Sequence, residues 1–181
     1  MRKIILLGFV SFCVLGSMWA QPANGNTPAA LIKSGDEQIE KGQYYNALEQ
    51  YEKSYKEVKD KDVAVKIART HFLLRDYGKA ATKFAQVLAR DKANKYIEER
   101  FLYGKALKMN AQYTEAAAEF NNYIANGTNM ELKAQAEIEL KESELKFRQI
   151  IHSSPMGIYV YEVNEMNQLI LVDTNPAADT L

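Results

Sequence analysis

The chain has 181 residues, of which 47% are apolar and 25% are charged, so it is long enough for one packed domain or two small ones. Its 23 basic side chains are matched by 23 acidic ones, which gives a formal net charge of zero. Proteins that bind nucleic acids usually carry a basic surplus that neutralises phosphates, so the composition argues against that class of function.

The first 20 residues have the pattern of a secretory signal peptide. A basic pair at positions 2 and 3 precedes an apolar run from Ile4 to Leu15, and small residues lead up to Ala20. We expect cleavage after Ala20 and export of the rest of the chain. An uncleaved N-terminal anchor is the alternative, because the bulky Met18 stands where a small residue is usual before the cleavage site.

The segment that follows the signal contains no cysteine, since Cys13 is the only one in the chain. Neither a disulfide nor a cysteine-based metal site is therefore expected in the exported protein. Residues 21–27 lack apolar periodicity and are rich in turn-forming residues, so we interpret them as a flexible leader.

The next hundred or so residues are predicted to be helical, because they are rich in Ala, Glu, Lys, Leu and Gln and contain no proline after Pro28. Short turns, such as Lys41-Gly42-Gln43, separate the helices in pairs, and connections of this length join antiparallel neighbours. The expected helices span residues 29–41, 44–57, 62–74, 77–89, 94–109 and 113–125.

One sequence element, Tyr-x-x-Ala-x-x-x-aromatic, occurs three times, starting at Tyr44, Tyr77 and Tyr113. The starts are 33 and 36 residues apart, and a small residue lies nine positions before each of them. This pattern resembles the tetratricopeptide repeat (TPR) family, whose unit of about 34 residues is a pair of antiparallel helices. The resemblance implies an all-α superhelix of three helical hairpins over residues 28–128. The small residues are Gly35, Ala68 and Gly104.

The repeated positions predict how the helices pack. Small residues in the first helix of each hairpin let the second helix approach closely, and we expect the repeated Ala of the second helix to meet them there. The aromatic residue one turn later is expected to fill the space between successive hairpins. The alanines are Ala47, Ala80 and Ala116, and the aromatics are Tyr51, Phe84 and Phe120.

Two further segments follow the repeats. A charged helical run from Met130 to Ile151 is expected to be a capping or linker helix, at 129–151, that covers the exposed face of the last hairpin. Beyond it, the β-rich segments 157–163 and 168–173 surround a polar turn and predict a β-hairpin.

The tail carries a second resemblance. The series Phe147, Ser154-Pro155, Gly157-Ile158 and Asn175-Pro176-Ala177-Ala178 resembles the opening of a PAS sensory domain, so we interpret residues 152–181 as an incomplete PAS-like segment. A two-stranded hairpin alone is only marginally stable. Two interpretations stay open: the chain is a fragment of a longer protein, or the tail is a loosely held appendage.

The sequence gives no support for catalysis. The two histidines, His71 and His152, lack the spacing of a metal site, and neither a nucleophile elbow nor a phosphate-binding glycine loop is present. We therefore expect neither an enzyme nor a cofactor.

TPR arrays present residues of their first helices along a concave groove, and the resemblance implies the same use here. The matching positions are apolar with basic residues toward the C-terminal end, which suits a protein or peptide partner with apolar anchors and acidic flanks. The expected groove residues are Ile32, Asp36, Ile39, Val65, Arg69, Phe72, Phe101, Lys105 and Lys108.

The third repeat has a closer resemblance. Residues 103–110, followed by Tyr113 and taken with the export signal, resemble the N-terminal TPR part of exported OmpA-type proteins of the envelope, as in type IX secretion machinery. This implies an exported scaffold or adaptor, periplasmic or associated with the outer membrane or secretion machinery, that docks a partner protein. The alternative is the N-terminal part of a TPR–PAS sensory protein.

Overall fold

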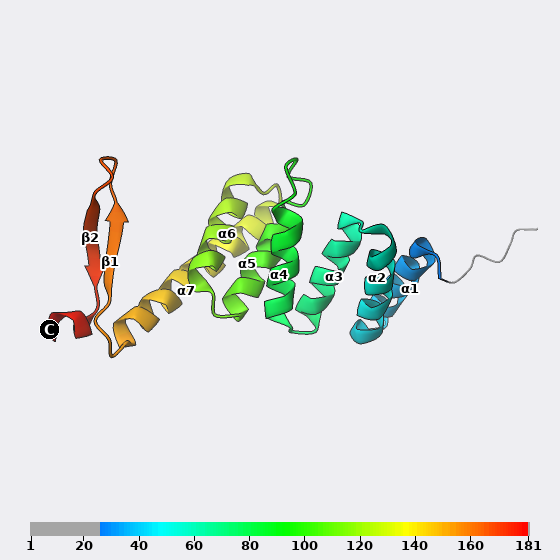
Figure 1. Ribbon diagram of the computed structural model, residues 1–181, viewed down its shortest axis with the longest axis horizontal. Helices are drawn as coiled ribbons and strands as arrows, with labels where there is room; N and C mark the ends of the chain where they lie inside the picture. Colours follow the sequence, from blue (N-terminus) through cyan, green and yellow to red (C-terminus); the bar gives the residue numbers. More distant parts are fainter. Residues whose placement is uncertain (1–25, 181) are drawn as a thin grey trace, which may run out of the picture.

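The computed structural model describes residues 26–180 (Figure 1). The predicted signal peptide, most of the predicted leader and the final residue lie outside this range. Seven helices and two strands follow one another in the described part. They are α1 (Pro28–Glu40), α2 (Tyr44–Val58), α3 (Lys61–Leu73), α4 (Tyr77–Leu88), α5 (Glu99–Met109), α6 (Tyr113–Asn126), α7 (Met130–Ser153), β1 (Tyr159–Val163) and β2 (Leu169–Thr174), and a 3-10 helix, η1 (Pro176–Thr180), ends the range.

The six array helices form three antiparallel hairpins stacked side by side, as predicted (Figure 1). One boundary was wrong: the fifth helix was expected from residue 94 but α5 begins at Glu99. The carboxylate of Asp91 accepts hydrogen bonds from the backbone N–H groups of Lys95 at 3.0 Å and Tyr96 at 2.7 Å, and Asn94 has a left-handed φ of 53°. These local bonds compete with helical ones, so this segment is a series of turns.

The glycines of the first helices allow close packing, but against a different neighbour from the one expected. A Cβ at Gly35 would lie 2.5 Å from the ring of Tyr51, and a Cβ at Gly104 would lie 2.7 Å from the ring of Phe120. The repeated aromatic, rather than the repeated alanine, therefore covers the glycine inside its own hairpin. Phe84 also reaches the next hairpin, where its ring centroid is 6.4 Å from that of Tyr103.

The main core runs through the second and third hairpins and into α7. Phe84, Phe120 and Tyr123 are fully buried there, and Ala136 brings α7 into the same cluster. A smaller cluster around Tyr51 joins the first hairpin to α3. Each hairpin thus buries its apolar face against the next, as in other repeat proteins.

Helix α7 caps this core with its first half, where Leu132, Ala136 and Leu140 pack against the cluster, as predicted for a capping helix. Its second half runs on past the hairpins toward the two strands (Figure 1). No helix of the described residues is both long and apolar enough to cross a membrane.

The tail is an antiparallel hairpin, as predicted, with Val163 opposite Leu169 and an irregularity in the register after Val160. The fully buried Asn175 joins it to α7. Its amide nitrogen lies 3.0 Å from the Ile151 carbonyl, and its side-chain oxygen accepts a hydrogen bond from the backbone N–H of Ile158 at 2.8 Å. This one side chain therefore satisfies backbone groups on both sides of the turn from helix to strand.

Candidate protein-binding surface

Helices α1, α3, α5 and α7 form one surface, which we call the first-helix face. Ion pairs link each of these helices to the next along the chain. Asp36 of α1 pairs with Lys66 of α3, and Arg69 of α3 pairs with Glu99 of α5. Lys105 and Lys108 of α5 pair with acids of α7. The face therefore carries a ladder of ion pairs that crosses from one hairpin to the next.

The pair between α1 and α3 is supported by a tyrosine. The carboxylate of Asp36 lies 2.6 Å from Lys66 Nζ and accepts a hydrogen bond of 2.6 Å from the Tyr51 hydroxyl. Burial by itself raises the pKa of Asp36, but the hydrogen bonds from Lys66 and Tyr51 outweigh it, so the pKa lies below its usual value. Both members of the ion pair are partly exposed, so the pair contributes at most about 1 kcal/mol.

The pair between α3 and α5 is the most buried on its acidic side. The side chain of Glu99 is 6% exposed and receives two hydrogen bonds from the guanidinium of Arg69, one of them 2.9 Å from Nε. These bonds raise the pKa of Arg69 more than burial lowers it. Because the carboxylate is buried and the fork is bidentate, this contact fixes the angle between α3 and α5 more firmly than a surface pair would.

The basic end of the predicted groove is neutralised from within the chain. Lys108 hydrogen-bonds to both Glu139 and Glu142 of α7, and Lys105 Nζ lies 3.7 Å from Glu139. Burial by itself lowers the pKa of Lys108, but the hydrogen bonds to the two carboxylates outweigh this effect. The pKa therefore lies above its usual value, and the ammonium stays charged. The expected basic surface for acidic flanks is therefore largely an internal ion-pair cluster.

The remaining groove residues divide into buried and partly exposed side chains. Val65 and Phe101 are 7% and 4% exposed, so they belong to the core and offer little contact area, contrary to the expectation from their positions. Ile32, Ile39 and Phe72 are partly buried and pack on the edges of the core clusters. These three keep some apolar surface on the first-helix face.

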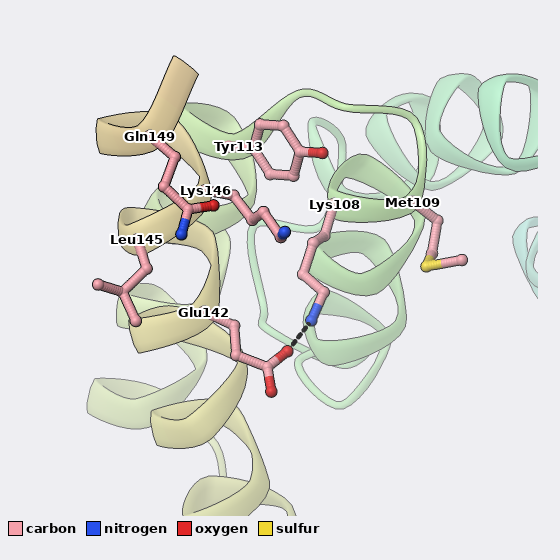
Figure 2. A pocket seen from close by; sticks show the side chains of 7 residues that line it. All are labelled: Lys108, Met109, Tyr113, Glu142, Leu145, Lys146 and Gln149. Carbon is pink, nitrogen blue, oxygen red and sulfur yellow. Dashed lines mark hydrogen bonds and ion pairs between the residues drawn. The ribbon is translucent and has the colours of Figure 1, made fainter. Parts of the chain in front are cut away.

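A cleft of about 580 Å³ opens beside the last ion pairs (Figure 2). The end of α5 contributes Met109, the first turn of α6 contributes Tyr113, and α7 contributes Leu145, Lys146 and Gln149. Lys108 and Glu142, which form an ion pair, also line it.

The histidines do not form a metal site within the described residues, where no cluster of three or more His, Cys, Asp or Glu side chains could hold an ion. His71 is 5% exposed, and its Nδ1 lies 3.7 Å from a carboxylate oxygen of Asp76 without a hydrogen bond. Burial lowers its pKa more than the Asp76 charge raises it, so the imidazole is a neutral core group at the end of α3. His152 lies in the last turn of α7 and is exposed.

The sequence predicted one member of each ion pair of the ladder as a groove residue. It did not predict the partners Lys66, Glu99, Glu139 and Glu142 or the apolar walls of the cleft. A signal was available, because the paired residues are 30, 31 or 34 positions apart along the chain, as for Asp36 and Lys66 or Lys108 and Glu142. These separations are one repeat of about 34 residues, or that repeat less about one helical turn. Opposite charges at these spacings in consecutive first helices mark ion pairs between hairpins.

Comparison with known proteins identifies the fold. No family model and no curated protein matches the chain. Among solved structures, the NMR structure of the first TPR domain of the human RPAP3 protein is similar, with a TM-score of 0.58 and 18% sequence identity. The match covers 71% of this chain and 98% of that domain. The stacked hairpins, the repeat length and this likeness together show that the chain has the fold of a TPR array with a capping helix and a short C-terminal β-hairpin.

Proposed function

We propose that the chain is a scaffold or adaptor that binds a protein or peptide partner on its first-helix face. The observation that carries this proposal is the ladder of ion pairs, which ties α1, α3, α5 and α7 into one surface before any partner arrives. A surface already held in place loses little conformational entropy on binding, so more of the contact energy remains as affinity.

Recognition on this face depends mainly on apolar anchors. The charges of Asp36, Arg69 and Lys108 are matched by neighbouring hairpins, so a partner gains little by pairing with them. The partly exposed side chains of Ile32, Ile39 and Phe72 lie on the same first helices as two of these charges and offer contacts for an amphipathic or extended segment.

The cellular setting of this function is also a proposal. The signal pattern of residues 1–20 supports export to the periplasm or the outer membrane, and residues 103–110 support an association with outer-membrane or secretion machinery. The proposed role is non-catalytic and needs no cofactor, in keeping with the absence of catalytic motifs from the sequence.

Selection of peptides from a random display library on the purified full chain tests the proposal. Enriched peptides should bind the wild type and bind Phe72→Ala at least about tenfold more weakly, since loss of a partly buried aromatic contact costs over 1 kcal/mol. Tyr45→Ala is the matched control, because Tyr45 is 76% exposed on α2, away from the first-helix face. Peptides that respond to the Tyr45 variant and ignore the Phe72 variant would reject the first-helix face as the binding site.

A sensory role is the second candidate, and the joint at Asn175 favours it. The Asn175 side chain donates a hydrogen bond to the carbonyl of Ile151 at the end of α7 and accepts one from the N–H of Ile158, just before β1. A shift of α7 would therefore move the hairpin with it. Hydrogen exchange of β1 and β2 with and without a selected peptide tests this role. Transmission predicts changed protection of the strands, whereas a plain scaffold predicts protection on α3, α5 and α7 alone.

A further inference from the structure

We propose that the cleft between α5, α6 and α7 receives a partner segment in which an apolar side chain stands next to a carboxylate. This inference rests on the proposed function and names the chemistry of the partner at one end of the first-helix face. The carboxylate belongs to an Asp or Glu side chain of the bound segment.

The walls of the cleft supply the apolar part of the site. Met109 of α5 and Leu145 of α7, which are 55% and 57% exposed, line the cleft at its two opposite sides. Tyr113 and the two lysines Lys108 and Lys146 lie between them in the view of Figure 2. A cavity of about 580 Å³ is large enough for an anchor side chain with part of its backbone. The unbranched side chain of Met109 can adapt its shape to an aliphatic anchor that enters the cleft.

The charges around the cleft supply the polar part. The ammonium groups of Lys108 and Lys146 and the single carboxylate of Glu142 line the cleft. Lys105 and Glu139, which do not line it, form an ion pair with each other, so they do not change this balance. The two lysines of α5 are paired, whereas Lys146 forms no hydrogen bond or ion pair with any described residue. Its charge reaches Glu142 only at longer range and lowers the pKa of that carboxyl slightly further than Lys108 does alone. One carboxylate from a bound partner would neutralise the remaining positive charge of Lys146.

A partner carboxylate that pairs with Lys146 would lie in the cleft, because Lys146 lines it. Its side chain extends from α7 toward α5, across the same opening that Met109 and Leu145 flank (Figure 2). Gln149, one turn further along α7, adds a side-chain amide that also lacks a partner among the described residues and can donate to the same group. The anchor and the carboxylate of the partner must therefore be close together in its sequence.

The probe for this site is the capped dipeptide acetyl-Leu-Glu-amide, titrated into the full chain labelled with carbon-13 at the methionine methyl groups. Met109 reports on the cleft, and Met130, Met156 and Met166 are internal controls, because they are 72–76% exposed and lie outside it. We expect a saturable shift of the Met109 signal alone. The charge-reversed acetyl-Leu-Lys-amide should bind more weakly, with an affinity lower by up to about fivefold, as expected for the loss of one exposed ion pair.

Two pairs of variants separate the apolar contact from the charge. Leu145→Ala should weaken dipeptide binding about tenfold, whereas Ile138→Ala, the same class of change at a 60% exposed site on α7, should not. Lys146→Gln should remove the preference for the Glu dipeptide, and Lys141→Gln should preserve it. All four positions are exposed, so the fold is retained.

The proposal is overturned if Met109 shifts no more than Met130, if the Glu and Lys dipeptides bind equally, or if Lys146→Gln leaves the preference intact. Such a result would leave the proposed function standing wherever library peptides still depend on Phe72. Loss of all peptide binding to the first-helix face would instead reject both.

Discussion

The helical array buries its large apolar side chains, whereas the C-terminal hairpin leaves most of its own exposed. In the array, large side chains such as Phe84, Phe120 and Tyr123 have no exposed surface. In the hairpin, neighbouring residues on both faces of β2 are open to solvent, with Leu169 71% exposed and Ile170 48% exposed. Within the described residues, the array therefore covers its large apolar side chains, whereas both faces of β2 stay largely exposed.

The difference follows from how each region meets its neighbours. A helical hairpin in a stack always has another hairpin or α7 beside it, so its apolar stripe is covered by the next repeat. Strands that are apolar on both faces are typical of the interior of a larger sheet, and two strands alone cannot cover each other's faces. The tail is consequently held by its joint at Asn175 and by its own ladder of hydrogen bonds.

The largest expected effect compares one aromatic of the array with one aliphatic of the hairpin. Phe84→Ala should lower the free energy of unfolding by about 3–5 kcal/mol, because it leaves a cavity in the main core. Ile170→Ala should change it by about 0.5 kcal/mol or less, because the side chain is already half in water. Urea unfolding followed by helical circular dichroism measures both, and equal losses would contradict the contrast.

The second prediction concerns the joint. Asn175→Ala leaves the backbone N–H of Ile158 without its partner, which costs about 1–3 kcal/mol locally. It also removes the amide bond to the Ile151 carbonyl, which then keeps the bond from the Ser154 N–H. We expect faster hydrogen exchange throughout β1 and β2 with unchanged exchange in α1 to α6. Slower unfolding of the tail, or loss of protection in the array, would show that the joint does not act as described.

The third prediction tests the close contact inside a hairpin. Gly104→Ala should destabilise the array by about 1–3 kcal/mol, because the new Cβ would overlap the ring of Phe120. Gly78→Ala is the matched control, since its Cβ would meet only Asn110 Oδ1 at 3.5 Å. There the better helix propensity of alanine should leave stability equal or raise it by up to about 1 kcal/mol. Thermal unfolding of both variants decides the point, and a tolerated Gly104→Ala would contradict it.

The smallest effect is a pH dependence of the ladder. The folded-state pKa of Asp36 lies below its unfolded value near 3.8, so its stabilising contribution is present above pH 4 and is lost as the pH falls through the folded-state pKa. The free energy of unfolding should fall less on acidification in Asp36→Asn than in the wild type, by a difference below about 1 kcal/mol. Glu37→Gln, at an exposed neighbour without an ion pair in the described structure, is the control. Identical acid titrations of Asp36→Asn and wild type would contradict the role of this pair.

Most of the array could be predicted from the sequence because its signals are local and repeat. The element beginning at Tyr44, Tyr77 and Tyr113 placed each second helix correctly to its first residue. The start of α5 could not be read in this way, because the side chain of Asp91 holds the preceding residues in turns through hydrogen bonds that leave no periodic pattern.

The binding surface was less predictable, because it depends on contacts between hairpins. Arg69 and Lys108 are at first-helix positions, as the repeat pattern indicates, but only the packed array brings Glu99 and Glu139 against them. The cleft depends in addition on the second half of α7, which continues past the hairpins. No property of residues 141–153 taken alone shows that Leu145 and Met109 will line the same cleft.

Site-specific photocrosslinking in the source cells tests the central claim, that a protein partner binds the first-helix face. A photoreactive residue would replace Ile39 or Phe72 on that face, or the 76% exposed Tyr45 on α2. The account predicts that one and the same partner is crosslinked from positions 39 and 72 and not from position 45. Crosslinking from position 45 alone, or none from positions 39 and 72, would contradict it.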